Sequence, residues 1–278
     1  MRDPTRLDKP VSESKAMGPV FLLAGGGRTG STLLQRLITS TRQVLIWGEH
    51  GGMLLPHLRK LAGRTHSWIE AASGYRMLDE FKTKSCNAWV PNLNPEPARL
   101  HLASRAFLDQ YLGASARKLG YARWGFKEIR YGAEDVAMLQ TLFPRASFVF
   151  LVRNPVSCLR SIKPLEWYAK DHHADPAVFL GEWARISGSL ASAYPECRCA
   201  CLVRYEDAVS DPSETARTIA QTIDVPFEAF DLSVFDRPLR GRASPPAALN
   251  DADWRALQAS HVAGVAEKLG YGPPERTG

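Results

Sequence analysis

The stretch Val20 to Thr32 reads V-F-L-L-A-G-G-G-R-T-G-S-T, and it decides the fold of this chain. Its first five residues form an apolar run that predicts a short buried strand, and three consecutive glycines follow at once. Apolar residues then recur at helical spacing, at Leu33, Leu34, Leu37 and Ile38. A strand, a glycine loop and a helix in this order form an anion site, because backbone N–H groups at the helix start point at the ligand.

Residues 25–32 match the phosphate-binding pattern G-x-x-x-x-G-K-[ST] except at one position. Ser31 stands where nucleotide triphosphatases have the lysine that reaches the β- and γ-phosphates. The later strand that would supply a Mg²⁺-binding aspartate ends in Arg153 instead. The loop can still hold an anion with its backbone, with Arg28 and with its hydroxyls. Metal-dependent phosphoryl transfer is therefore disfavoured, and we expect no metal site.

Short apolar runs alternate with helical patterns along the rest of the chain. Further strands are predicted at Val44–Trp47, Ala122–Phe126, Ser147–Val152 and Cys199–Val203. Strands that alternate with helices imply right-handed crossovers, so we expect a P-loop-type α/β fold, a parallel sheet with helices on both faces. Residues 53–120 predict a mostly helical insert. We expect residues 1–18 to form a flexible tail and residues 19–272 a single domain.

Two further motifs each follow a predicted strand. Residues 148–161 run from a strongly apolar strand through R-N-P to a helix, and Ser161 lies eight positions after Arg153. Residues 202–207 read L-V-R-Y-E-D, with Tyr205 just past the last strand. The carboxyl ends of parallel strands meet at one edge of a sheet, where ligands bind. Arg153 offers a bidentate guanidinium for a second anion there, and Ser161, two helical turns on, adds a hydroxyl.

These three segments together resemble the sulfotransferases that use 3′-phosphoadenosine-5′-phosphosulfate (PAPS). Residues 27–34 are similar to the 5′-phosphosulfate loop shared by tyrosylprotein and many bacterial carbohydrate sulfotransferases. Residues 148–161 resemble the family's 3′-phosphate site, and residues 202–212 resemble its V-R-Y-E-D segment. The resemblance covers residues 20 to about 225. It implies that PAPS is bound by Gly27, Arg28, Thr29, Gly30, Ser31, Thr32, Arg153, Ser161 and Tyr205.

The resemblance also implies that a sulfuryl group passes from PAPS to an acceptor hydroxyl, leaving 3′-phosphoadenosine-5′-phosphate (PAP). Such in-line transfer depends on positioning, on charge stabilisation and on a base for the acceptor proton. Glu49 is the expected base, because it follows the second strand, is placed next to the first strand and its loop, and is flanked by glycines. It resembles the glutamate base of tyrosylprotein sulfotransferases. His50 is the rival base.

Lys127 follows the third predicted strand and resembles a lysine that contacts the sulfuryl group in tyrosylprotein sulfotransferases. A cation there would stabilise negative charge on the bridging oxygen, and Arg28 is expected to share this work. The alternative for Lys127 is a surface ion pair with Glu128 or Glu134.

Composition limits the partners and the setting. A net charge of +6 and a pI near 9.1, without a run of basic residues, favour local anion sites over nucleic-acid binding. No stretch approaches the ~18 apolar residues that span a bilayer. Five cysteines, an odd count, argue against a disulfide framework, so a reducing cytoplasm is expected. The acceptor is expected to be a small molecule or a glycan, and the sequence leaves the oligomeric state open.

Some segments and hypotheses stay open. Residues 164–175 are interpreted as a lid, and Arg240 and Arg242 either close over the nucleotide or belong to a solvated loop. The rival functions are a P-loop kinase or hydrolase with an altered loop, and a non-catalytic module that binds PAPS or another nucleotide. The kinase or hydrolase hypothesis predicts Mg²⁺-dependent turnover of ATP, and the replacement of the loop lysine by Ser31 argues against it. The second is opposed by the presence of both Glu49 and Lys127.

Overall fold

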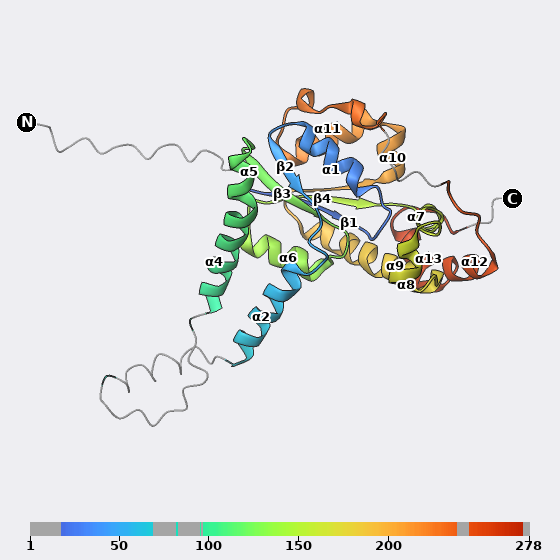
Figure 1. Ribbon diagram of the computed structural model, residues 1–278, viewed down its shortest axis with the longest axis horizontal. Coiled ribbons are helices and arrows are strands. Elements are labelled where there is room, and N and C mark those ends of the chain that lie inside the picture. Colours follow the sequence, from blue (N-terminus) through green and yellow to red (C-terminus); the bar gives the residue numbers. More distant parts are fainter. Residues whose placement is uncertain (1–17, 69–81, 83–94, 96, 238–244, 275–278) are drawn as a thin grey trace, which may run out of the picture.

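The computed structural model describes residues 18–68, 82, 95, 97–237 and 245–274. These residues form a five-stranded sheet, parallel throughout, in the order β2-β3-β1-β4-β5 (Figure 1). The strands are β1 (Val20–Ala24), β2 (Val44–Trp47), β3 (Arg123–Glu128), β4 (Ser147–Val152) and β5 (Ala200–Arg204). The predicted α/β fold with a parallel sheet is confirmed. β3 begins one residue later and ends two residues later than predicted, and β5 begins and ends one residue later.

Side chains alternate between the two faces of the sheet, and each face has its own core. Val20 and Leu22 pack on one face with residues of α1 (Ser31–Ser40) and α11 (Pro212–Ile223). Phe21 and Leu23 pack on the other face with residues of α6 (Ala133–Leu142) and α9 (Pro176–Ala193). Every residue of β1 and β4 is buried, as expected for central strands of a parallel sheet covered on both sides.

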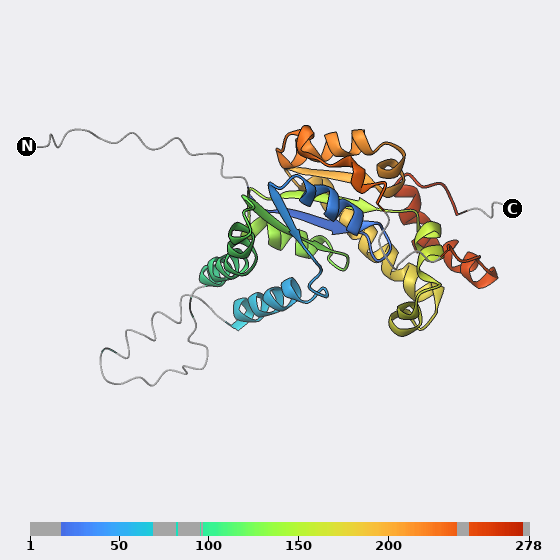
Figure 2. The same cartoon turned by 45° about the horizontal axis from the view of Figure 1, so that its top comes forward.

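Helices cover both faces of the sheet, as predicted (Figures 1 and 2). One face carries α1 (Ser31–Ser40), α10 (Tyr205–Ser210) and α11 (Pro212–Ile223). The other face carries α6 (Ala133–Leu142) and α9 (Pro176–Ala193). Short turns of helix follow α9 at η2 (Tyr194–Glu196) and α11 at η3 (Phe227–Ala229) and η4 (Leu232–Val234).

A third group of helices packs around α9 beyond the end of β4. It consists of α7 (Pro155–Ile162), α8 (Glu166–His172), α12 (Asp251–Leu257) and α13 (Ser260–Lys268). The segment that the sequence suggested as a lid contains α8, in which Tyr168 and His172 are buried against Phe179 of α9. These two side chains anchor α8 to α9, while most other residues of the segment are exposed.

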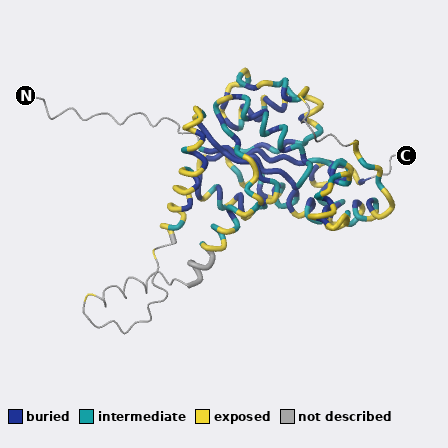
Figure 3. Tube along the Cα trace, in the orientation of Figure 1, coloured by how far each residue is buried: buried dark blue, intermediate teal, exposed yellow. Residues whose placement is uncertain are grey.

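The described part of the insert is helical, as predicted. It contains α2 (Leu54–Trp68), α4 (Pro97–Leu108), the π-helical turn η1 (Asp109–Gly113) and α5 (Ala114–Lys118). Many exposed residues lie along α2 and α4, in contrast to the buried strands (Figure 3). Residues 1–17 of the predicted tail, most of residues 69–96, and Arg240 and Arg242 lie outside the described residues. Within the described residues, no helix is both long and apolar enough to cross a membrane.

One expectation about strand order is wrong. The second strand does not lie next to the first, because β3 lies between β1 and β2. In the register, Leu22 of β1 is opposite Lys127 of β3, and Trp47 of β2 is opposite Phe126. Glu49, which follows β2, is therefore separated from the glycine loop by the end of β3. Lys127 occupies this position between the two.

Candidate functional site

The glycine loop after β1 contains residues in the left-handed backbone region. Arg28 has φ 66° and Gly30 has φ 89°. For a residue with a side chain this conformation costs on the order of 1 kcal/mol, so the surroundings of the loop must hold Arg28 in it. A Cβ atom on Gly30 would lie 2.2 Å from Cδ2 of Tyr205. Glycine is therefore needed at position 30 both for the backbone angle and for the approach of the tyrosine ring.

Internal hydrogen bonds fix the loop. Ser187 of α9 is fully buried, and its hydroxyl donates to Gly25 O at 2.9 Å. Thr29 is also fully buried, and its hydroxyl donates to Gly26 O at 3.0 Å. The Thr29 hydroxyl, which the sequence suggested as a ligand contact, is therefore used inside the loop. Ser31 is buried as well, at the start of α1.

Arg28, Arg153, Ser161 and Tyr205 come from four different segments and form one cluster. Arg28 Nε donates to Ser161 Oγ at 2.9 Å, and Arg153 Nη1 donates to Arg28 O at 2.9 Å. The guanidinium carbon of Arg153 lies 4.1 Å from the centre of the Tyr205 ring. The glycine loop, the end of β4, α7 and the end of β5 thus bring these residues together at one edge of the sheet.

One N–H group of the Arg153 side chain finds no acceptor among the described residues. Its Nε is buried and has no hydrogen-bond partner in the described structure. Its backbone is held in place, because Trp183 Nε1 donates to Arg153 O at 3.1 Å. A buried guanidinium N–H is costly to leave without an acceptor, so this group fits an anionic oxygen supplied by a ligand. The cluster of Arg28, Arg153 and Ser161 is therefore a candidate anion site.

Lys127 connects the glycine loop to Glu49. Its Nζ lies 2.7 Å from Glu49 Oε1 and 3.4 Å from Thr32 Oγ1. The Lys127 side chain is 8% exposed and that of Glu49 is 29% exposed. The alternative of a surface pair with Glu128 or Glu134 is therefore wrong, because Lys127 is buried and pairs with Glu49.

Arg130 is a second cation on Glu49. Its Nη1 lies 2.9 Å from Glu49 Oε2 and 3.1 Å from Glu128 Oε1. Burial raises the pKa of Glu49, but hydrogen bonds and positive charge from Lys127 and Arg130 outweigh burial and hold that pKa below its ordinary value of 4.5. Glu49 is thus an ionised carboxylate at neutral pH, with one oxygen on each cation.

His50 has different surroundings. Its ring meets the edge of Phe126 at 5.4 Å between centres, and Tyr111 lies 6.5 Å away. Its Nδ1 is buried without a hydrogen-bond partner in the described structure. Burial lowers the pKa of His50 below its ordinary value although the charge of Glu128 raises it. The imidazole is therefore neutral at pH 7 and packs in an aromatic environment.

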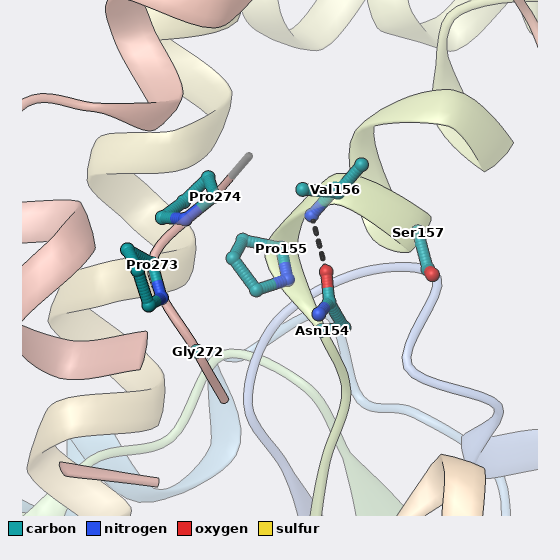
Figure 4. A pocket seen from close by; sticks show the side chains of 7 residues that line it. All are labelled: Asn154, Pro155, Val156, Ser157, Gly272, Pro273 and Pro274. Atoms are coloured by element: carbon teal, nitrogen blue, oxygen red, sulfur yellow. Dashed lines mark hydrogen bonds between the residues drawn. The ribbon is translucent and has the colours of Figure 1, made fainter. Parts of the chain in front are cut away.

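The start of α7 borders a separate cavity of about 300 Å³. It is lined by Asn154, Pro155, Val156, Ser157, Gly272, Pro273 and Pro274 (Figure 4). Asn154 Oδ1 accepts from Val156 N and caps the helix, while Glu206 accepts from Asn154 N and from the Tyr271 hydroxyl. These contacts join the ends of β4 and β5 to the C-terminal residues. None of the site residues expected from the sequence lines this cavity.

The structure brings the predicted residues into two adjoining clusters. The anion cluster holds Arg28, Arg153, Ser161, Tyr205 and Gly30, and the reaction cluster holds Glu49, Lys127 and Thr32. Gly27, the residue before Arg28, lies against Trp167 of α8, whose ring centre is 6.0 Å from the Arg28 guanidinium carbon. Among the described residues, no group of three histidines, cysteines or carboxylates is placed to hold a metal ion.

Sequence reasoning did not identify Trp167, Arg130 or Glu128 as site residues. Arg130 and Glu128 had one detectable signal, because charged residues at the end of an otherwise apolar strand predict a polar cluster at the sheet edge. Their pairing with the loop after β2 depends on strand order, which the pattern of residues did not reveal. Trp167 is placed by the packing of α8, and no motif marks it.

The comparisons with known proteins concern the family and the fold of the chain. A family model described as the sulfotransferase family matches residues 19–229. No curated protein matches the chain significantly.

Solved structures resemble the whole fold at low sequence identity. A sulfotransferase domain from the curacin biosynthetic pathway aligns with a TM-score of 0.52 and 15% identity, covering 93% of this chain and 99% of that domain. A sulfotransferase domain from the olefin synthase of Synechococcus PCC 7002 aligns with a TM-score of 0.52 and 18% identity, covering 93% of this chain and 96% of that domain. At these identities the likeness is one of fold.

Proposed function

Because the chain belongs to the sulfotransferase family, we propose that it transfers the sulfuryl group of PAPS to a hydroxyl of an acceptor. The observation that carries this proposal is the contact between the two expected anion sites. Arg28 Nε meets Ser161 Oγ, and Arg153 meets the Arg28 backbone, each at 2.9 Å. One nucleotide with an anionic group at each end can therefore touch the glycine loop and Arg153 together.

The donor residues divide between the two ends of the nucleotide. In this proposal the backbone of residues 27–32 and the Arg28 side chain hold the phosphosulfate. Arg153 and Ser161 hold the 3′-phosphate, and the buried Arg153 Nε supplies a donor that otherwise has no acceptor. Tyr205, fixed against Gly30 and Arg153, borders the nucleotide.

The chemistry is an in-line displacement at sulfur. The acceptor oxygen forms a bond to sulfur while the bond between sulfur and the bridging oxygen breaks, and that electron pair stays with the phosphate of PAP. Lys127, aided by Arg28, stabilises the negative charge that develops on the bridging oxygen. Glu49 takes the acceptor proton, and its place next to Lys127 puts base and cation within one hydrogen bond of each other.

Glu49 is favoured over His50 because of its position. Its carboxylate contacts Lys127, which in turn reaches Thr32 of the glycine loop. His50 packs against Phe126 instead. Before the donor binds, Glu49 is held by both cations, so its basicity is low. When the sulfuryl group attracts Lys127, Glu49 loses one of these contacts and becomes a stronger base.

Neutral hydroxyls of carbohydrates, lipids or natural-product small molecules all suit this chemistry, so the acceptor is proposed at that level. A nucleotide kinase or hydrolase with an altered loop is less well supported, because Ser31 and Arg153 stand where its lysine and Mg²⁺ ligand would be.

The proposal is tested by thermal unfolding with PAP, AMP or Mg-ATP. A ligand that binds the native state raises the midpoint in proportion to ln(1 + [L]/Kd). We expect PAP to give the largest shift and Mg-ATP little. A shift with Mg-ATP and none with PAP would show that the protein is not a PAPS-dependent sulfotransferase. A shift with PAP, together with no PAP release from PAPS in the presence of hydroxyl acceptors, would favour a binding module.

A further inference from the structure

Glu128 is a charged residue inside the sheet that the proposed chemistry does not yet use. It is the last residue of β3, and its side chain is 0% exposed. Burial of a carboxylate is tolerated when its oxygens are fully hydrogen-bonded. The two oxygens of Glu128 have different partners, which lie in the loop after β2 and in the residues that follow β3.

One oxygen of Glu128 holds the loop that carries Glu49. Glu128 Oε2 accepts from the backbone N–H of His50 at 3.1 Å and from that of Gly52 at 2.8 Å. Glu49 directly precedes the first of these N–H groups. The turn after β2 is therefore anchored to the end of β3 by a side chain, although the two strands are far apart in the sequence.

The other oxygen of Glu128 holds a cation on Glu49. Glu128 Oε1 accepts from Ile129 N at 2.9 Å and from Arg130 Nη1 at 3.1 Å. The same Arg130 nitrogen lies 2.9 Å from Glu49 Oε2. The stem of Arg130 is also confined, because a Cβ atom on Gly52 would lie 2.9 Å from Arg130 Cβ.

We infer that Glu128 is a positioning residue of the sulfuryl-transfer site, which orients Glu49 through the backbone of its loop and through Arg130. This inference rests on the proposed function of Glu49. The charged and titratable groups that face Glu49 are Lys127, Arg130, the neighbouring His50 and, behind Arg130, Glu128 itself. A carboxylate suits this role because it has two oxygens, each able to accept two hydrogen bonds.

The first test compares Glu128→Gln with Glu134→Gln, a control whose carboxylate is 78% exposed and pairs with Arg59. Glutamine has one oxygen and cannot serve both the loop and Arg130. In donor-free protein we expect the pKa of Glu49, followed by ¹³C NMR of glutamate carboxyl groups and assigned with Glu49→Gln, to rise by about one pH unit. Removal of the negative charge of Glu128 alone would lower the pKa of Glu49. A rise in that pKa therefore shows that Arg130 no longer contacts Glu49.

A second pair of variants moves Arg130 without changing Glu128. Gly52→Ala places a methyl group against the Arg130 stem, whereas Gly51→Ala meets nothing nearer than Met53 Cγ at 4.0 Å. Both glycines have positive φ, 70° and 65°, so the backbone strain is matched. We expect the Glu49 pKa to rise in Gly52→Ala and to change little in Gly51→Ala. PAPS hydrolysis, with water as acceptor, should slow about tenfold in Gly52→Ala and Glu128→Gln.

The outcomes separate this inference from the proposed function. If the Glu49 pKa falls or stays unchanged in Glu128→Gln, or if Gly52→Ala behaves like Gly51→Ala, Glu128 does not act through Arg130. A misfolded Glu128→Gln leaves the glycine pair as the deciding comparison. Wild-type protein that PAP does not stabilise would overturn the proposed function, whereas the NMR titrations need no nucleotide.

Discussion

Lys127 Nζ lies 2.7 Å from Glu49 Oε1, so the cation and the base expected for the reaction are paired before any donor arrives. The pair forms because β3 lies between β1 and β2 and brings the end of β3 against the loop after β2. Thr32, 3.4 Å from the same nitrogen, links the pair to the glycine loop.

Replacement of Glu49 by glutamine should remove the base and leave the nucleotide site intact. We expect PAPS turnover with a hydroxyl acceptor to fall by about 10²–10⁴-fold, the usual contribution of a general base. PAP should still raise the unfolding midpoint as in the wild type. His50→Asn is the comparison, and we expect a smaller loss there. A greater loss in His50→Asn than in Glu49→Gln would make His50 the base.

The ion pair should also make stability depend on pH. The folded-state pKa of Glu49 is below 4.5, so its ionised form stabilises the fold above the unfolded-state value, and this contribution is lost as pH falls through the folded pKa. The difference in unfolding free energy between wild type and Glu49→Gln should therefore be largest near pH 7 and shrink below about pH 4. Urea unfolding at several pH values measures it. If the difference in unfolding free energy stays constant across this pH range, the folded-state pKa of Glu49 is not lowered by the ion pair.

Arg153→Ala should weaken PAP binding more than binding of adenosine 5′-phosphosulfate, which lacks the 3′-phosphate. A charge-assisted hydrogen bond contributes about 1.5–3 kcal/mol, which corresponds to about 10–100-fold in Kd. Titration calorimetry with both nucleotides measures the ratio. Arg160→Ala is the matched control, because Arg160 is exposed on the same α7 and donates to Ala247 O. Equal losses for both nucleotides would place Arg153 away from the 3′-phosphate.

Gly30→Ala should distort the loop, because the new methyl group would collide with the Tyr205 ring. Gly120→Ala is the control, with φ 86° against 89° for Gly30 and no atom within 4 Å of the added Cβ. We expect Gly120→Ala to cost about 1 kcal/mol of unfolding free energy for its backbone angle. Gly30→Ala should cost about 1–3 kcal/mol more and reduce PAP binding. Similar unfolding free energies for the two variants would show that the Tyr205 ring can move away from position 30 at little energetic cost.

The strands, and the gathering of Arg28, Arg153 and Ser161 at one edge of the sheet, could be predicted because their signals are local. The apolar runs correctly predicted both ends of β1 and of β4. Arg28, Arg153 and Ser161 were recognised from short motifs at strand ends. Parallel strands collect such motifs at one edge whatever their order. The joining of these three residues therefore needed no knowledge of long-range packing.

The surroundings of Glu49 could not be predicted in the same way. Periodicity shows where a strand is but not which strand is its neighbour, so the place of β3 between β1 and β2 was missed. For the same reason, the partner of Lys127 and the contacts of Arg130 and Glu128 were not predicted. Thr29 shows the same limit on a smaller scale, because a hydroxyl in a glycine loop can serve a ligand or the loop itself.

The four charged side chains that meet beyond the ends of β2 and β3 carry no net charge, because Lys127 and Arg130 balance Glu49 and Glu128. An uncharged acceptor that enters there has no charge for salt to screen, so its apparent affinity should hardly respond to ionic strength. The nucleotide is a polyanion in a protein of net charge +6, so added salt should loosen its binding. Under the proposed function, added salt should therefore weaken binding of the nucleotide and leave binding of an uncharged acceptor nearly unchanged.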